Sequence, residues 1–213
     1  MADKEILIFV EGPSDKVFLE VYLYFLEDFP IKNFKVKDVK GKDNLSKRLL
    51  EIEKYDKTLI IFDANKDYES NKKEILTVVS KRKQTISEEQ IFLFPNNQDD
   101  GDLETLLLEI AKHDEFLKCF ESYLECIKSK EHHEPIKNIR KNMLYAYLEV
   151  FELQKFFQYK WDTNNKKQEK CLIDDKGKIK EEHKEEYEKL KEVIDFNSKS
   201  LIPLKDFLGQ FAK

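Results

Sequence analysis

Short apolar runs alternate with stretches of helical periodicity through the first half of the chain. The runs cover residues 5–10, 58–62 and 90–94, and they consist mainly of Ile, Leu, Phe and Val. Unbroken runs of this kind are typical of strands that are buried on both faces of a sheet. A weaker, Lys-rich stretch at 34–39 alternates apolar and polar positions, which predicts an edge strand.

Between these strands, apolar residues recur three or four positions apart, which predicts amphipathic helices. The helices are expected around residues 17–25, 45–52, 75–79 and 103–110. Asp43 or Asn44 is available to cap the second of them. Strands that alternate with helices through short connections predict an α/β fold, in which a mainly parallel sheet is covered by helices on both faces.

From about residue 112 onward the pattern changes and predicts helices without a further buried strand. The features of this part are helical stripes at 116–127 and 139–147, a polar loop or hairpin at 163–180, a charged helix at 181–193 and a Pro-initiated helix at 202–208. We therefore expect an α/β domain over residues 1–111 and a helical extension over residues 112–213 that packs on it.

The composition is typical of a folded, helix-rich protein, with 40% hydrophobic and 38% charged residues. No apolar run approaches the roughly 20 residues that a membrane-spanning helix needs, and the chain does not begin like a signal peptide. We therefore expect a cytoplasmic protein without a membrane partner. Cys119, Cys126 and Cys171 have no Cys-x-x-Cys spacing, so neither a disulfide framework nor a zinc ribbon is expected.

The net charge of −5 argues against a protein whose whole surface binds nucleic acid, because Lys and Arg drive phosphate binding. The segment from Lys32 to Arg48 is locally basic, with only two acidic residues. It predicts a contact with a polyanion, and a solvated Lys-rich face is the alternative interpretation. The candidate nucleic-acid-binding residues in it are Lys40, Lys42, Lys47 and Arg48.

Acidic side chains follow the apolar strands at the points where the strands end. Glu11 and Asp63 come directly after such runs, and Asp15, Asp67 and Glu104 stand a few residues further along. The carboxyl ends of parallel strands meet at one edge of a sheet, where ligands bind. Clustered carboxylates repel one another unless a hard cation lies between them. The sequence therefore predicts a site for Mg²⁺ or Mn²⁺ at this edge.

Three motifs resemble those of the TOPRIM domain, which occurs in topoisomerases, primases and OLD-family nucleases. A Glu after a hydrophobic strand, followed by Gly and Asp, is the first motif; the second is Asp-x-Asp after another strand, and here Asn65 replaces its second Asp. The third is similar to a Gly-x-Leu-Glu segment of OLD-like nucleases and small uncharacterised bacterial TOPRIM proteins. The motifs are Ile8-Phe9-Val10-Glu11-Gly12-Pro13-Ser14-Asp15, Ile61-Phe62-Asp63-Ala64-Asn65-Lys66-Asp67 and Gly101-Asp102-Leu103-Glu104.

The resemblance covers roughly residues 4–111 and implies a nuclease that uses Mg²⁺ or Mn²⁺ to hydrolyse DNA or RNA. It implies that Glu11 binds the metal or acts as a general acid or base, with Gly12 and Asp15 in the same catalytic motif. The metal ligands that it implies are Glu11, Asp63, Asn65, Asp67 and Glu104. It also implies bacterial phage defence as the setting, and an ATPase or another protein as a partner.

Each candidate has a structural interpretation beside the functional one. Gly12 could simply serve a turn, Asp15 and Glu104 could be first-turn helix acids, and Asp67 could be a solvated loop acid. The neutral amide of Asn65 binds a cation more weakly than a carboxylate does.

Two other functions remain open from the sequence. Asn65 and the acidic net charge are compatible with a non-catalytic, partner-binding scaffold. The Asp-x-Asn-x-Asp run at 63–67 suggests a phosphatase of the haloacid-dehalogenase type, although that family places its nucleophilic Asp on the first strand.

Overall fold

The computed structural model describes residues 5–26, 34–80, 86–131, 134–156 and 178–211. Four strands form one sheet in the order β2-β1-β3-β4, and every neighbouring pair is parallel. The strands are β1 (Ile6–Val10), β2 (Phe34–Asp38), β3 (Lys57–Asp63) and β4 (Ile91–Phe94). The predicted parallel sheet, with the Lys-rich strand at one edge, is confirmed.

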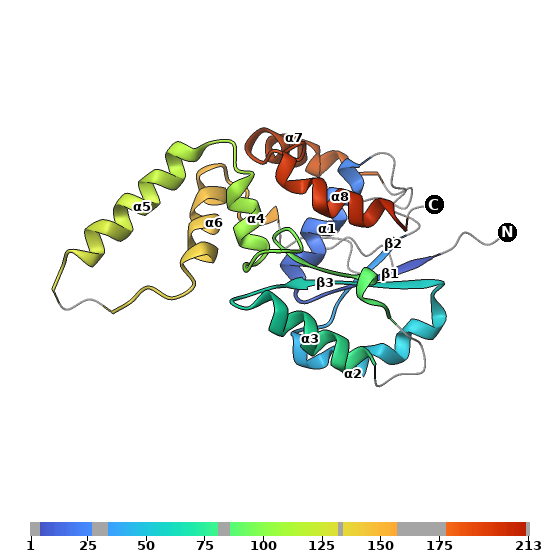
Figure 1. The fold of residues 1–213 in the computed structure, drawn as a ribbon. Coiled ribbons are helices and arrows are strands. Elements are labelled where there is room, and N and C mark those ends of the chain that lie inside the picture. The colour runs from blue at the N-terminus through green and yellow to red at the C-terminus, as the bar shows by residue number, and fades with distance from the viewer. Residues whose placement is uncertain (1–4, 27–33, 81–85, 132–133, 157–177, 212–213) are drawn as a thin grey trace.

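Alternate residues of the strands point to opposite faces, and each face has its own apolar cluster. In β1, Ile6, Ile8 and Val10 join one cluster, whereas Leu7 and Phe9 join the other. α1 (Pro13–Phe25) and α4 (Leu103–Glu109) belong to the first face, and α3 (Tyr68–Val79) belongs to the second (Figure 1). The α/β fold with helices on both faces is therefore confirmed.

The second predicted helix is not continuous. It consists of η2 (Lys42–Asn44), the short α2 (Leu45–Arg48) and η3 (Leu49–Lys54), in which η denotes a 3₁₀ helix. Asn44 precedes α2, but its side chain makes no capping hydrogen bond. The buried Leu45 and Leu49 are four positions apart, as suits the α turn, whereas Leu49 and the buried Ile52 are three apart, as suits the 3₁₀ turn.

The second half of the described chain is helical. Its elements are α5 (Asp114–Lys128), α6 (Ile139–Val150), α7 (Glu181–Val193), η7 (Lys199–Leu201) and α8 (Ile202–Gly209); η4 (Glu88–Gln90) precedes β4. α6 packs on α4, while α7 and α8 lie over α1 (Figure 1). The rings of Tyr22 and Phe196 lie 6.3 Å apart, and those of Phe92 and Phe207 lie 5.3 Å apart. One apolar cluster therefore crosses the predicted domain boundary at residue 111, and that boundary stays a prediction.

Some predictions concern residues outside the described part of the chain. These are Lys32 of the basic segment, most of the polar stretch 163–180 and Cys171. Cys119 and Cys126 are exposed, free thiols on α5. Among the described helices, none combines the length and the hydropathy that crossing a membrane requires.

Candidate metal centre at the carboxyl edge of the sheet

Glu11 and Asp63 lie on neighbouring strands at the same edge of the sheet. β1 and β3 pair in a register that sets Val10 beside Ile61, so both strands end at nearly the same level along the sheet. Glu11 is the first residue after β1, and Asp63 is the last residue of β3. The two apolar strands thus fix two carboxyl groups close together.

One carboxylate oxygen of Glu11 is buried without a hydrogen-bond partner among the described residues. This atom is Oε2. Burial raises the pKa of Glu11, while the backbone N–H of Asp63, which donates to the carboxylate, and the nearby ammonium of Lys42 lower it. A buried acceptor without a donor is costly. This oxygen is therefore suited to a ligand that carries positive charge.

Asp15 lies in the first turn of α1, and only 8% of its surface is exposed. Its Oδ2 accepts a hydrogen bond of 2.7 Å from the N–H of Gly12, as a first-turn acid does. Burial, followed by the charges of Glu104 and Glu11, raises the pKa of Asp15 to about 7; the Gly12 N–H and Lys141 act in the opposite direction. Asp15 is both a helix-capping acid and a member of the acidic group.

The carboxyl group of Asp63 has the other acids as its neighbours. Its Oδ1 accepts a hydrogen bond of 3.0 Å from the N–H of Leu103, the first residue of α4. Burial raises the pKa of Asp63 to about 9, with further increases from Asp15, Glu11 and Glu104 and a decrease from the Leu103 N–H. Mutual repulsion in a buried place therefore disfavours the ionised form, and a bound cation would reverse that preference.

Asp67 and Asn65 have structural roles in the loop between β3 and α3. The side chain of Asp67 is exposed and caps α3 by accepting a hydrogen bond of 2.9 Å from the N–H of Ser70. Asn65 has a left-handed backbone with φ of 57°, which Asn tolerates better than most residues. Its N–H donates to the carbonyl of Gly101 at 2.6 Å. The conformation of the loop thus accounts for Asn65 without a metal.

Four of the predicted acids influence one another through their charges, namely Glu11, Asp15, Asp63 and Glu104. Within the described ranges, no three or more His, Cys, Asp and Glu side chains gather as a ready metal-binding group. The donors are nevertheless all oxygens, which suit Mg²⁺ or Mn²⁺, and Oε2 of Glu11 lacks a partner. The residues therefore fit a hard divalent cation in kind and charge, because Mg²⁺ usually completes its coordination with water and substrate oxygens.

Two glycines at this edge have different backbone requirements. Gly12 has φ of −136° and ψ of 177°, and an added Cβ would make only an ordinary contact of 3.6 Å with Oδ2 of Asp15. Gly101 has φ of 150°, and a Cβ there would lie 2.9 Å from Cδ of Pro95. Glycine is therefore required by the fold at 101, whereas at 12 it leaves space beside the acids.

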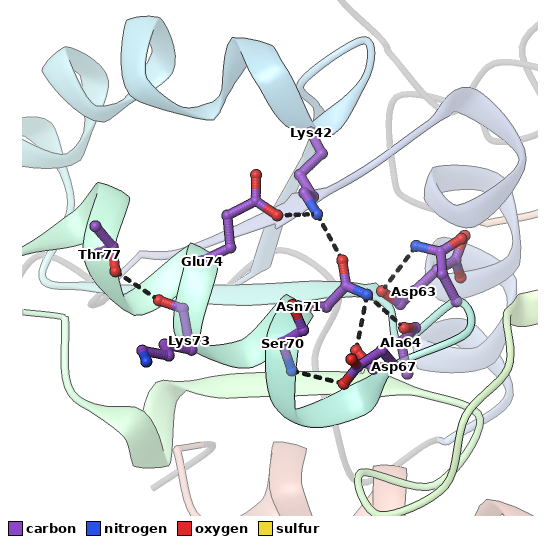
Figure 2. A network of polar contacts seen from close by, with 10 residues as sticks. Lys42, Asp63, Ala64, Asp67, Ser70, Asn71, Lys73, Glu74 and Thr77 are labelled. Atoms are coloured by element: carbon purple, nitrogen blue, oxygen red, sulfur yellow. Dashed lines mark hydrogen bonds and ion pairs between the residues drawn. The ribbon is translucent and has the colours of Figure 1, made fainter.

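A polar network holds the loops around the acids, and Figure 2 shows it. The side chain of Asn71 donates to the carbonyls of Ala64 and Asp67, at 2.7 and 2.9 Å. Its Oδ1 accepts from Nζ of Lys42, which also forms an ion pair with Glu74. Lys42 is thus part of the framework beside Glu11. Sequence patterns did not single out Asn71, because a helical Asn carries no signal of its contacts.

The other basic candidates lie along the loop and helices that follow β2. Lys40 is exposed, with a left-handed backbone. Nζ of Lys47 donates to Asn44 at 3.0 Å, and Nη1 of Arg48 pairs with Glu51 at 2.9 Å. Their contact with nucleic acid stays a prediction.

A groove of about 560 Å³ opens beside the acids. Asp63, Asn65, Lys66, Asp102 and Glu104 line it from the α/β half, and Ile136, Asn138, Ile139, Arg140 and Lys141 line it from the helical half. Arg140 and Lys141 were not among the site residues predicted from the sequence. The only sequence signal for them was a basic stretch at the start of the helix predicted at 139–147.

Neither the comparison with curated proteins nor the comparison with solved structures found a match. A family model described as a protein of unknown function (DUF3226) matches residues 5–213, which is nearly the whole chain. The protein therefore belongs to the DUF3226 family.

Proposed function

We propose that the protein is a nuclease of the TOPRIM type, which binds Mg²⁺ or Mn²⁺ and hydrolyses phosphodiester bonds in nucleic acid. One observation carries the proposal: Glu11, Asp15 and Asp63 meet at the carboxyl edge of a parallel sheet, where burial raises the pKa of all three and the charges of neighbouring acids of the group further raise the pKa of Asp15 and Asp63. Buried like charges of this kind destabilise the folded state unless something positive binds there. These acids belong to the TOPRIM-like motifs of the sequence, and that resemblance implies metal-dependent hydrolysis of phosphodiester bonds.

Glu11 and Asp63 would hold the cation, because they lie on adjacent strand ends and Oε2 of Glu11 has no donor among the described residues. A bound divalent cation supplies charge neutralisation for the phosphate and activation of an attacking water. Asp15, held by the Gly12 N–H, is placed to orient that water or to accept a proton. Lys42 balances part of the negative charge at Glu11.

Titration calorimetry with Mg²⁺ and Mn²⁺, paired with cleavage assays on single- and double-stranded DNA and RNA, tests the proposal. We expect the wild type to bind the metal and to cleave only when the metal is present. Asp63→Ala should lose both properties. Asp114→Ala is the matched control, because it removes one exposed carboxylate on α5 that does not belong to the acidic group, and it should retain both properties.

Asp67→Asn separates two roles of that residue. Asn can cap a helix as Asp does, so the start of α3 should be preserved. Metal binding that falls in this variant would make Asp67 a ligand as well as a cap. Unchanged binding would leave Asp67 with the capping role alone.

The structural role of Asn65 favours one competing function, a non-catalytic scaffold that binds a protein partner. Its left-handed backbone and its hydrogen bond to Gly101 explain the residue without a cation. Absence of metal binding at millimolar concentrations, together with absence of cleavage, would reject the nuclease and support the scaffold.

A further inference from the structure

The groove beside the acids has opposite charges on its lining. Asp63, Asp102 and Glu104 supply carboxylates, whereas Lys66, Arg140 and Lys141 supply cations. Lys66 comes from the loop after β3, and the other two come from the first turn of α6. The helical half thus contributes basic groups to a site whose acids all come from the α/β half.

Two of these three cations make no ion pair within the described part of the chain. The side chains of Lys66 and Lys141 are exposed, and Lys141 makes only a long cation–π contact, 5.9 Å from the ring of Tyr145. Two other lysines near the sheet are paired, Lys37 with Glu51 at 2.6 Å and Lys72 with Glu88 at 2.7 Å. Lys66 and Lys141 are therefore available to an anion that enters the groove.

Arg140 has a different role, because it fixes α6 against α4. Its Nη2 pairs with Oδ2 of Asp102 at 2.9 Å, and Asp102 caps the helix whose first N–H donates to Asp63. The position of Lys141, the next residue, is thereby tied to the position of the acids. The charge of Lys141 is felt at Asp15, where it lowers the pKa.

We propose that this groove binds a short single-stranded segment of nucleic acid and that Lys66 and Lys141 contact its phosphates. The proposal rests on the proposed function and names its substrate class. The cation held by the acids and the two lysines would then neutralise the same stretch of backbone from opposite walls of the groove. Lys66 and Lys141 are binding residues of the strand, and Arg140 is a positioning residue.

Size and charge favour a single strand over a duplex. A groove of about 560 Å³ lies in the range of pockets that enclose one small organic ligand, so it suits a nucleotide or two. Proteins that bind a duplex neutralise many phosphates along a wide basic surface. This groove offers two unpaired lysines, on a chain whose net charge is −5.

Fluorescence anisotropy with a dye-labelled oligothymidylate of about eight nucleotides tests the proposal, with Ca²⁺ in place of Mg²⁺ to fill the oxygen site. Each phosphate contact on a single strand contributes about −0.7 to the slope of log K against log salt. We expect Lys66→Gln or Lys141→Gln to make the slope less steep than that of the wild type by about 0.7. The double variant should make it less steep by about 1.4, and the remaining slope would come from the cation at the acids.

Lys118→Gln on α5 is the matched control, because it makes the same change of charge at an exposed lysine that pairs with Asp114. It should keep the wild-type slope and affinity. Urea unfolding of each variant checks that the fold is retained. An oligouridylate probe of equal length should show the same changes of slope, since the proposal concerns the phosphate backbone that DNA and RNA share.

The outcomes distinguish this inference from the proposed function. A slope that is the same in the double variant and the wild type, or tighter binding of a duplex with the same sequence, overturns the inference. Metal-dependent cleavage that survives such a result would leave the nuclease intact. Strand binding with the expected slopes in a protein that binds no metal would support the groove and reject the nuclease.

Discussion

The charged side chains at the carboxyl edge of the sheet and those described in the basic segment from Lys32 to Arg48 have opposite kinds of neighbours. In the basic segment, Lys37 and Arg48 both pair with Glu51, at 2.6 and 2.9 Å. At the edge, Asp15 and Asp63 have each other as like-charged neighbours and are stabilised mainly by backbone N–H groups. Both regions look like charge clusters in the sequence, but only at the edge are acids buried with other acids as neighbours.

The difference shows which charged cluster serves structure and which is suited to function. Paired charges on a surface contribute little to stability and need no further ligand. Buried carboxylates that repel one another lower stability, and such perturbed groups are concentrated at functional sites. Experiments that change one region while leaving the other intact test whether the edge has a functional role and the basic segment a structural one.

Glu11→Gln should have the largest effect, because it removes a charge from the edge while keeping the shape of the side chain. We expect cleavage to fall by about 10²-fold or more with the fold retained, because losing a residue that holds the cation should cost at least as much as losing a group that supports a metal ligand. Initial rates on a single-stranded substrate measure the loss. Unchanged rates would show that the unpartnered oxygen of Glu11 takes no part in the chemistry.

Asp63→Asn should stabilise the metal-free protein. The pKa of Asp63 is about 9 in the folded state and near 4 when unfolded, so the folded protein holds an extra proton between these values. Its stability therefore falls as the pH rises from about 4 to 9. The stability of the variant does not fall in this way, so the variant should be the more stable protein at neutral pH, by up to about 4 kcal/mol.

Urea unfolding in EDTA at several pH values measures this effect, and the amide oxygen of Asn can still accept the hydrogen bond from Leu103. Added Mg²⁺ should stabilise the wild type and have no effect on the variant. Stability curves that run parallel across the whole pH range would show that Asp63 is ionised in the metal-free protein.

Asn71→Ala tests the link between the two regions. It removes two hydrogen bonds to backbone carbonyls and the contact with Lys42 (Figure 2), which should cost about 1–3 kcal/mol of stability. We also expect metal affinity to fall, because the loop after β3 and the loop after β2 lose a common partner. Calorimetry and thermal unfolding of the same samples would show whether the two losses occur together.

Lys37→Met should have the smallest effect. The ion pair with Glu51 is partly exposed, with 31% of the Lys37 side chain and 26% of the Glu51 side chain accessible, so its loss should cost less than about 1 kcal/mol. Cleavage should be unchanged. A loss of cleavage as large as that of Glu11→Gln would assign the basic segment a functional role and remove the contrast.

β1, β3 and β4 could be predicted because each is a short run of large apolar residues that is buried on both faces, as Ile61 and Phe62 are. β2 could be predicted from its alternation of apolar and polar residues. The acids could be placed at one edge because parallel strands end together. The role of Asp67 could not be predicted, because a cap and a metal ligand have the same side chain. Lys141 could not be placed at the acids, since its position depends on how α6 packs against α4, which periodicity does not encode.

The apolar cluster on one face of the sheet includes residues from the start and from the end of the chain. Phe18 and Tyr22 of α1 belong to the same cluster as Leu204 and Phe207 of α8. During synthesis the ribosome releases the sheet and α1 long before α8. The part of this face that α8 covers therefore stays exposed to water until α8 has been synthesised, so the first half of the chain cannot bury its whole apolar core by itself.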